Sequence, residues 1–396
     1  MGKRIRVYLK RFWHRIRSRF NGPATTVAKR EDVTLESSSG QGSPGNGRIA
    51  VPDDYKKIAN IIGRVVLSEE PNVYHETRSF STGRLIAGEF ERLGYSVEIN
   101  GKIVIANVKG RKILFIETET PGTSLLGYRI LKNKKMARKL FKEAGLSIAK
   151  GKIFSHNKME QAKKFAMSLT SAVLKPIRGN KSKGVTVGVR TPLDFFDAWN
   201  KAIKVNQQGV LVEEQFINGT EARYLVVGGK CIAVINRIPP HVIGTGSDTL
   251  KELITRKNKY RLTNPNLATK QIKLDKSRME NLKKQGYRLS SIPPEGSVVL
   301  IDWKAGISAG ADSSDVTDKV HPSFKQIAET VTSLVPGLDV IGVDILAHDH
   351  TKKAQPDNYI VIEANTRPGI GSHHYPVYGK SRNVTKEIVE YVIRQL

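Results

Sequence analysis

The chain has 396 residues, enough for more than one domain, and its hydrophobic content of 39% is ordinary for a globular protein. No apolar run approaches the roughly 20 residues of a membrane-spanning helix. A single cysteine, Cys231, excludes an internal disulfide bond and fits a reducing compartment. The formal net charge of +28 favours anionic partners such as nucleotides, nucleic acid, acidic polymers or a membrane surface.

Cys231 lies in an apolar, strand-like run, so we expect a buried, unreactive thiol.

The first 20 residues form a basic arm that contains no acidic residue. Apolar residues recur in it at helical spacing, namely Ile5, Leu9, Phe12, Ile16 and Phe20. This basic amphipathic pattern favours reversible contact with an anionic membrane surface. The alternatives are a disordered basic tail that aids solubility and a segment that contacts nucleic acid. Residues 21–51 are rich in Gly, Ser, Thr and Pro, so we expect a flexible linker there.

A small N-terminal α/β domain is expected over residues 52–130. Residues 81–94 have the pattern of a helix that ends at a glycine, and short strands follow at 95–99, 103–106 and 113–116. No dinucleotide-binding fingerprint occurs in this region.

Lysines and glycines then follow one another in an order that suits a phosphate-binding site. Residues 134–145 form a cationic helix that ends at a glycine, and the next apolar strand carries Lys175. A loop with Gly179 and Gly184 leads back into a second strand. Glycines let backbone amides approach an anion closely, and the lysines add positive charge. The pattern therefore predicts a phosphate site, with a lysine-rich hairpin tip on the surface as the alternative.

Residues 210–227 read as two strands joined by a short linker. The first strand ends at Glu214, the linker passes Gly219, and the second strand places Glu221 and Arg223 on one face. A linker backbone can hydrogen-bond a purine edge, and carboxylates can hold an amino group or ribose hydroxyls. Taken alone, these residues are also consistent with ordinary exposed charges.

A second basic block extends over residues 251–288. We expect its lysines and arginines to form a solvated helical face, which is the usual outcome for a run of charges. The same block could attract an acidic substrate.

Two strand-like runs near the C-terminus carry oxygen donors. Asp344 lies in the first, and Glu363 and Asn365 lie two residues apart in the second, so their side chains leave the same face. If the two strands pair, the three side chains converge. Carboxylate and amide oxygens suit Mg²⁺, which completes its shell with water and substrate phosphates. The alternative is a surface hairpin with ordinary polar residues.

Taken in this order, the lysine, the glycine loop, the linker and the Asp…Glu-x-Asn set resemble the ATP-grasp superfamily. The likeness runs from about residue 131 to the C-terminus and is nearest to the ATP-grasp portion of cyanophycin synthetase, with glutathione synthetase and D-alanine–D-alanine ligase more distant. It implies an α/β (α+β) protein with an ATP-grasp fold, in which two α+β lobes grip ATP and a lid subdomain spans about residues 150–220. Two positions depart from the family pattern, Gly306 and Ala311. The portion that follows the ATP-grasp part of cyanophycin synthetase is not expected, because the chain ends at Leu396.

The resemblance also implies ATP and Mg²⁺ (or Mn²⁺) as cofactors and a role for each site residue. The phosphates would be bound by Lys135, Lys175, Gly179, Lys183 and Gly184. Adenine and ribose would be bound by Glu214, Gln215, Ile217 and Glu221. The metal ligands would be Asp344, Glu363 and Asn365. Arg223 and Arg237 would stabilise the transferring phosphoryl group and the tetrahedral intermediate, and the substrate would contact Ser308, Gly310 and His374.

We therefore expect a cytoplasmic, ATP-dependent carboxylate–amine ligase, peripheral at the inner membrane face if its arm binds there. The expected substrate is an amino acid or small peptide, nucleic acid is not an expected partner, and a homo-oligomer is left open. Two alternatives remain. One is a ligase that extends an acidic amino-acid polymer, and the other is a catalytically silent ATP-grasp module that binds nucleotide or a polyanion.

Overall fold

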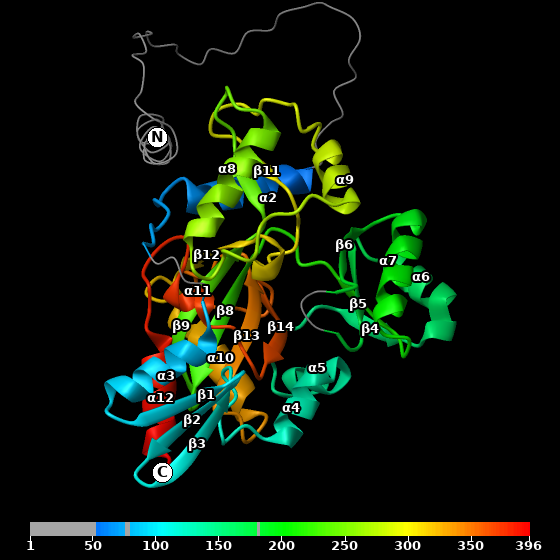
Figure 1. The fold of residues 1–396 in the computed structure, drawn as a ribbon. Coiled ribbons are helices and arrows are strands. Elements are labelled where there is room, and N and C mark those ends of the chain that lie inside the picture. Colours follow the sequence, from blue (N-terminus) through cyan, green and yellow to red (C-terminus); the bar gives the residue numbers. More distant parts are fainter. Residues whose placement is uncertain (1–52, 76–79, 180–182) are drawn as a thin grey trace, which may run out of the picture.

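The computed structural model describes residues 53–75, 80–179 and 183–396, so the predicted arm and linker lie outside the described residues (Figure 1). Its elements are grouped around one central antiparallel sheet. Within the described residues, no helix combines the length and the apolar character that crossing a membrane would require.

The N-terminal part contains a helix packed on a three-stranded antiparallel sheet. Helix α3 (Thr82–Arg92) begins at its N-cap, Ser81, and is followed by Gly94, whose φ of +83° favours glycine. Strands β1 (Ser96–Asn100), β2 (Ile103–Val108) and β3 (Arg111–Ile116) pair in the order β1–β2–β3. The helix and strands expected here are confirmed, whereas a domain boundary at residue 130 stays a prediction.

A four-stranded antiparallel sheet with two helices on one face forms a unit that we call the lid, residues 151–214. Its strands are β4 (Gly151–Phe154), β5 (Ala172–Pro176), β6 (Thr186–Val189) and β7 (Val210–Glu214), in the order β4–β7–β5–β6. Leu174 and Val212 are buried on the face that packs against α6 (Met159–Met167) and α7 (Pro192–Val205). A short turn of helix, η1 (His156–Lys158), precedes α6.

The central sheet has five antiparallel strands in the order β12–β9–β8–β13–β14. Their bounds are β8 (Thr220–Val227), β9 (Lys230–Ile238), β12 (Asp312–Asp315), β13 (Val340–Ala347) and β14 (Tyr359–Asn365). One face is covered by α4 (Leu125–Lys132), α5 (Lys134–Glu143) and α10 (Pro322–Ser333). Part of the other face is covered by α3 and α12 (Val384–Arg394), where Leu225 and Val340 are buried. The short helix α11 (Gly371–His374) follows β14.

Cys231 lies on β9 and is buried, as expected. Burial raises the pKa of its thiol to about 12, so the thiolate form is negligible at neutral pH.

A further group of elements lies between β9 and β12 in the sequence. It comprises β10 (His241–Ile243), α8 (Leu250–Thr263), α9 (Lys276–Lys284), β11 (Val298–Leu300) and η2 (Ile307–Ala309). Helix α2 (Asp53–Val66) packs against β11. In Figure 1, α2, α8 and α9 lie above the central sheet, the lid lies to its right, and β1–β3 lie below.

The expectation of a solvated helical face over residues 251–288 is wrong for part of the block. Arg261 is fully buried and its Nη1 donates to Asp312 at 2.7 Å, and Arg278 is buried with its Nε donating to Asp302 at 3.1 Å. The acidic partners come from distant parts of the sequence, so charge density alone does not reveal these buried pairs. Other basic residues of the block are exposed, as expected, among them Lys273, Lys276, Lys283 and Lys284.

Candidate active site

A row of ionic side chains crosses one face of the central sheet. Arg223 on β8 lies directly opposite Asp344 on β13, and Asp344 lies directly opposite Glu363 on β14. Directly opposed residues leave the same face of a sheet, so the three side chains gather together. Glu221 and Arg237 are opposed on β8 and β9 and continue the row two residues further along the strands. The structure thus brings together residues that the sequence separates by more than 100 positions.

Asp344 is the centre of this ionic cluster. Arg223 donates to its two carboxylate oxygens from Nε at 2.6 Å and from Nη2 at 2.5 Å, and Arg237 Nη1 donates to Oδ2 at 3.2 Å. Burial opposes ionisation of Asp344, but the charges of Arg223 and Arg237 outweigh it and lower the pKa of the carboxyl group. Arg237 also pairs with Glu221, whose pKa is raised by burial although Arg237 lowers it. Asp344 is therefore ionised at neutral pH while it is only 2% exposed.

Glu363 and Asn365 complete the predicted metal set beside Asp344. Both are half-buried on β14, and Asn365 Nδ2 donates to Glu363 Oε1 at 3.1 Å. Among the described residues, no three His, Cys, Asp or Glu side chains gather as a metal-binding group. A cation here would therefore depend on the amide and on non-protein oxygens as well as on the carboxylates. That mixed donor set fits Mg²⁺, which takes few protein ligands and keeps oxygens from water and phosphate.

A second ionic cluster lies on the face of the lid opposite to α6 and α7. Lys175 on β5 and Arg138 on α5 both pair with Glu213 on β7. Arg138 Nη1 donates to Glu213 Oε2 at 2.7 Å, and Arg138 Nη2 donates to the Ala149 carbonyl at 2.6 Å. Glu213 is buried, whereas Lys175 and Arg138 remain partly exposed. Two cations and one carboxylate thus form a compact group between the lid and α5.

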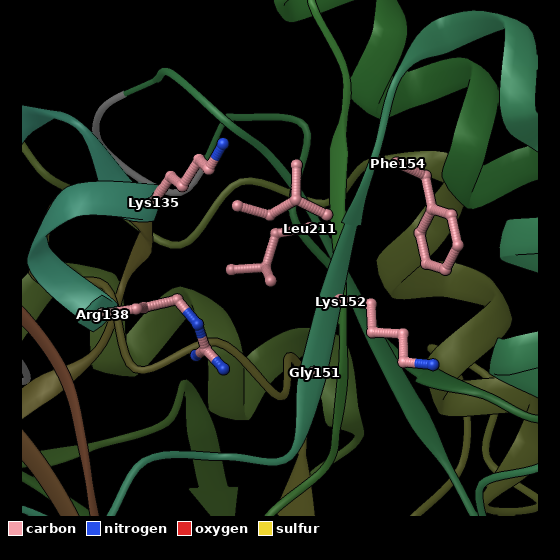
Figure 2. A pocket seen from close by; sticks show the side chains of 7 residues that line it. Lys135, Arg138, Gly151, Lys152, Phe154 and Leu211 are labelled. Carbon is pink, nitrogen blue, oxygen red and sulfur yellow. The ribbon is translucent and has the colours of Figure 1, made fainter. Parts of the chain in front are cut away.

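A pocket of about 380 Å³ lies beside this second cluster. Its lining is both cationic and apolar, and consists of Lys135, Arg138, Gly151, Lys152, Ile153, Phe154 and Leu211. Figure 2 shows Lys135, Arg138 and Leu211 on the α5 side of β4, whereas Lys152 and Phe154 lie on the other side of that strand. A lining that combines cations with apolar side chains suits a ligand that has both an anionic and an aromatic part.

Two adjacent lysines at the start of α5 have different surroundings. Lys135, the predicted phosphate ligand, is exposed and lines the pocket. Lys134 is half-buried, and its charge interacts with Glu363 on the central sheet and with Lys175 and Glu213 on the lid. Burial lowers the pKa of Lys134, and Lys175 lowers it further, while Glu363 and Glu213 raise it. The charge of Lys134 is therefore influenced by both ionic clusters.

The predicted glycine loop follows β5. Residues 180–182 lie outside the described residues, and the structure describes Gly179, Lys183 and Gly184 on either side of them. Gly184 has a φ of +70°, and a Cβ atom there would lie 2.9 Å from Val205 Cγ2. Glycine is therefore required at this end of the loop. Lys183 and Gly179 are exposed, so both are accessible to a ligand.

The linker from β7 to β8 joins the lid to the central sheet. Glu214 N donates to the Lys150 carbonyl at 2.8 Å, and Gln215 N donates to the Ser171 carbonyl at 2.9 Å. Because the Gln215 N–H is already bonded, the predicted backbone contact of Gln215 with adenine would come from its carbonyl. Ile217 is half-buried. Gly219 has no room for a side chain, since a Cβ atom would lie 2.5 Å from the Phe216 ring.

The three predicted substrate residues lie on two elements, Ser308 and Gly310 at η2 and His374 on α11. Ser308 is exposed on η2, and Gly310 adopts a φ of +107° at a position where a Cβ atom would lie 2.8 Å from Ile272 Cγ1. His374 forms a hydrogen bond between its Nε2 and Thr385 Oγ1 at 3.1 Å, and burial lowers its pKa to about 4. Neither Ser308 nor His374 has a described contact with the cluster around Asp344.

His373, rather than His374, faces the ionic cluster. Burial lowers the pKa of His373 to about 3, and the charges of Arg223, His374 and Arg237 lower it as well. The imidazole is 1% exposed, and its Nδ1 atom has no hydrogen-bond partner among the described residues. The family resemblance singled out His374 as a substrate residue, and that role stays a prediction, whereas His373 is the histidine whose pKa the two arginines of the cluster lower.

Sequence reasoning also gave no role to Glu213, Arg138 and Lys134. A signal for Glu213 did exist. Successive residues of a strand point to opposite faces. In β7, Val210 and Val212 are buried in the lid core, so Leu211 and Glu213 lie on the opposite face. Arg138 and Lys134 lie in a helix rich in basic residues, where only the tertiary contacts single them out.

Comparison with solved structures gives a match to a bifunctional glutathione synthetase from Pasteurella multocida. The TM-score is 0.59 at 29% sequence identity, over 80% of this chain and 44% of that chain. The chain has the ATP-grasp fold. No protein-family model matches it. The resemblance to ATP-grasp proteins and the α+β fold class that were expected from the sequence are confirmed.

Curated relatives of this ATP-grasp chain agree with the structural match. It is 30% identical to the cyanophycin synthetase of Geminocystis herdmanii over 275 residues, which is 68% of this chain and 31% of the relative. It is 32% identical to the glutathione biosynthesis bifunctional protein GshAB of Mannheimia succiniciproducens over 284 residues, which is 70% of this chain and 37% of the relative. The ATP-grasp chain thus spans about a third of the length of these relatives.

Proposed function

We propose that the chain is an ATP-dependent ligase that activates a carboxylate as an acylphosphate and joins it to an amine. The observation that carries this proposal is the position of Lys134. Its charge interacts with Lys175 and Glu213 on the lid and with Glu363 on the central sheet. The proposed phosphate ligand Lys175 and the proposed oxygen donor Glu363 thus both interact with one lysine, which supports a site for a nucleotide triphosphate with its metal.

The nucleotide would lie between the lid and the central sheet. Lys175 and Lys134 would bind its phosphates, with Gly179, Lys183 and Gly184 closing over them. The pocket beside α5 and the linker with Glu214, Gln215 and Ile217 would accommodate adenine, and Glu221 would bind the ribose. Lys135 lines the same pocket and would add positive charge.

The central sheet would carry the chemistry. Asp344, Glu363 and Asn365 would hold Mg²⁺, which when bound neutralises phosphate charge. Arg223 is fixed by its two hydrogen bonds to Asp344, and from this fixed position its guanidinium group would stabilise charge that develops during transfer. Arg237, held by Glu221 and Asp344, would act beside it.

The reaction would proceed in two steps. A substrate carboxylate oxygen attacks the γ-phosphorus of ATP, and the bond from that phosphorus to the bridging oxygen breaks to release ADP. An amine nitrogen then attacks the acyl carbon, the bond from this carbon to the phosphate oxygen breaks, and the amine loses a proton as the amide forms. These steps require positioning and charge neutralisation rather than a protein nucleophile.

The substrates would be amino acids or small peptides. This inference is supported by the names of the relatives, which refer to the synthesis of glutathione and of cyanophycin. A ligase that extends an acidic polymer remains a narrower version of the same proposal, favoured by the exposed lysines of the 251–288 block. Contact of residues 1–20 with an anionic membrane is a separate proposal, and those residues lie outside the described part of the chain.

A screen of acid–amine pairs for ADP and phosphate release tests the function. We expect release with at least one pair, dependent on both substrates and on Mg²⁺. A scaffold that only binds nucleotide would release none with any pair, although it would still bind ATP in a calorimetric titration. The two measurements together therefore distinguish a ligase from a silent module.

A further inference from the structure

We propose that Glu213 is an internal counter-ion that competes with nucleotide phosphates for Lys175 and Arg138. This inference rests on the proposed function, because it takes Lys175 to be a phosphate ligand. It adds a residue that lowers the affinity of the site for phosphate groups and thereby limits how tightly nucleotide is held.

The contacts of Glu213 occupy both cations. Its Oε1 pairs with Lys175 Nζ, and its Oε2 accepts from Arg138 Nη1 at 2.7 Å. The Glu213 side chain is 5% exposed, whereas those of Lys175 and Arg138 are 16% and 15% exposed. The carboxylate is thus largely enclosed, while each cation remains partly exposed.

The surrounding structure is built to admit this carboxylate. Glu213 lies opposite Gly151 on β4 and opposite Val173 on β5. A Cβ atom at Gly151 would lie 2.7 Å from Glu213 Cβ and 3.2 Å from Arg138 Nη2. Any side chain at Gly151 would therefore displace Glu213 or its arginine. The glycine leaves the space in which Glu213 reaches Arg138.

The charges nearby explain why a counter-ion matters. Lys134 also interacts with Glu213, and Lys135 lines the adjacent pocket with Arg138. Without Glu213, this corner of the lid would present only cations to a phosphate chain. With it, a phosphate oxygen must replace a carboxylate oxygen at Lys175 or share the cation with it. Charge-assisted pairs of this kind are strong enough for such competition to be measurable.

The test is isothermal titration calorimetry of the full chain with ATP, adenosine and inorganic tripolyphosphate, each in the presence of Mg²⁺. Glu213→Gln should tighten binding of ATP and of tripolyphosphate about tenfold, the order expected for removing one charge a few ångströms from a phosphate. Binding of adenosine, which has no phosphate, should be unchanged. The matched control is Glu160→Gln, which removes an exposed carboxylate from α6 of the same lid and should change none of the three.

Two results would overturn the proposal that Glu213 is a competing counter-ion. If Glu213→Gln weakens ATP binding or leaves it unchanged, Glu213 orients Lys175 rather than competing for it. If adenosine affinity changes as much as ATP affinity, the substitution has altered the shape of the site. Thermal unfolding of each variant shows whether it is folded, because removing one partner of a buried ion pair is destabilising.

If Glu213→Gln does not fold, the same comparison is made in an Arg138→Gln background. Arg138→Gln removes one of the two cations that Glu213→Gln would leave without a carboxylate partner. Arg138→Gln with Glu213→Gln should bind tripolyphosphate more tightly than Arg138→Gln alone, and equal affinities would again reject the proposal. Failure of the proposed function gives a different result, in which the wild-type chain binds no ATP while tripolyphosphate still binds more tightly to Glu213→Gln.

Discussion

Arg223 and Asp344 face each other directly across strands β8 and β13, and the guanidinium group donates one hydrogen bond to each carboxylate oxygen. This two-point contact fixes the plane of the guanidinium group as well as its position. Because the Asp344 side chain is 3% exposed and the Arg223 side chain 12% exposed, water screens the pair weakly. Arg223 is therefore held in one orientation before any ligand arrives.

Arg223→Lys should lower kcat by roughly 10²-fold or more, because lysine keeps the charge but cannot make the two-point contact. The KM for ATP should change much less if Arg223 acts mainly on the transferring phosphoryl group. Steady-state ADP release measures both constants. Arg92→Lys is the control, because Arg92 lies exposed on α3 and should give wild-type rates. A kcat for Arg223→Lys within a factor of about two of wild type would remove Arg223 from the reaction.

Glu363→Ala should abolish turnover, since it removes one oxygen donor and one negative charge from the proposed metal set. The loss should persist at raised Mg²⁺ concentration, whereas a purely weakened metal affinity would be overcome. The matched control is Glu390→Ala on α12, which removes a carboxylate that pairs with Lys386 and Arg394 on the same helix. A Glu363→Ala variant with near-normal activity would contradict the metal role.

Lys175→Ala should raise the KM for ATP and lower the rate, by roughly 10²-fold or more if the lysine stabilises phosphoryl charge. Its loss also leaves the Glu213 carboxylate with one of its two ion-pair partners, Arg138. Initial rates over a range of ATP concentrations measure the two effects separately. An unchanged ATP profile would show that Lys175 lies outside the nucleotide site.

The ionic cluster of the central sheet was predictable from the sequence because β-strands have a simple period. Glu363 and Asn365 lie two residues apart, so their side chains share one face of the strand whichever strand it pairs with. The pairing of β13 with β14 then brings Asp344 beside them. Arg223 and Glu221 follow the same rule on β8.

The lid contacts were less predictable because they depend on how separate units dock. Whether Lys134 or Lys135 approaches the proposed phosphate site depends on how α5 docks against the lid, because the two adjacent lysines both belong to the basic side of this amphipathic helix. His373 and His374 present the same difficulty on α11. The buried partners of Arg261 and Arg278 come from residues up to 51 positions away, and no local pattern identifies them.

Deleting residues 1–20 should weaken binding to anionic liposomes and leave the activity in solution unchanged. The reason is the basic amphipathic pattern of the arm, whose attraction to anionic lipid falls with ionic strength. Co-sedimentation with vesicles that contain anionic lipid measures it, and vesicles of neutral lipid are the control. Equal sedimentation of the full and shortened chains would exclude the arm as the membrane contact.

Stability should fall steeply on mild acidification because three histidines are buried in neutral form. Burial lowers the pKa of His241 and of His373 to about 3 and that of His350 to about 4. In the unfolded chain their pKa would be about 6.5, so between about pH 6.5 and pH 4 the unfolded state binds more protons. Each histidine then removes up to about 1.4 kcal/mol of folding free energy per pH unit as the pH falls. Glu221, with its raised pKa, acts in the opposite direction but is a single group.

Urea unfolding at about pH 7 and about pH 5 measures this loss. His350→Gln should reduce the difference between the two conditions, because burial keeps His350 neutral although its hydrogen bond to the Thr220 carbonyl at 2.9 Å raises its pKa. His156→Gln, at an exposed position on η1, should leave the difference unchanged. Below about pH 4 the lowered pKa of Asp344 adds to the loss, since protonating that carboxylate leaves Arg223 and Arg237 without their buried counter-ion. A protein equally stable at both pH values would show that these imidazoles are not buried in neutral form.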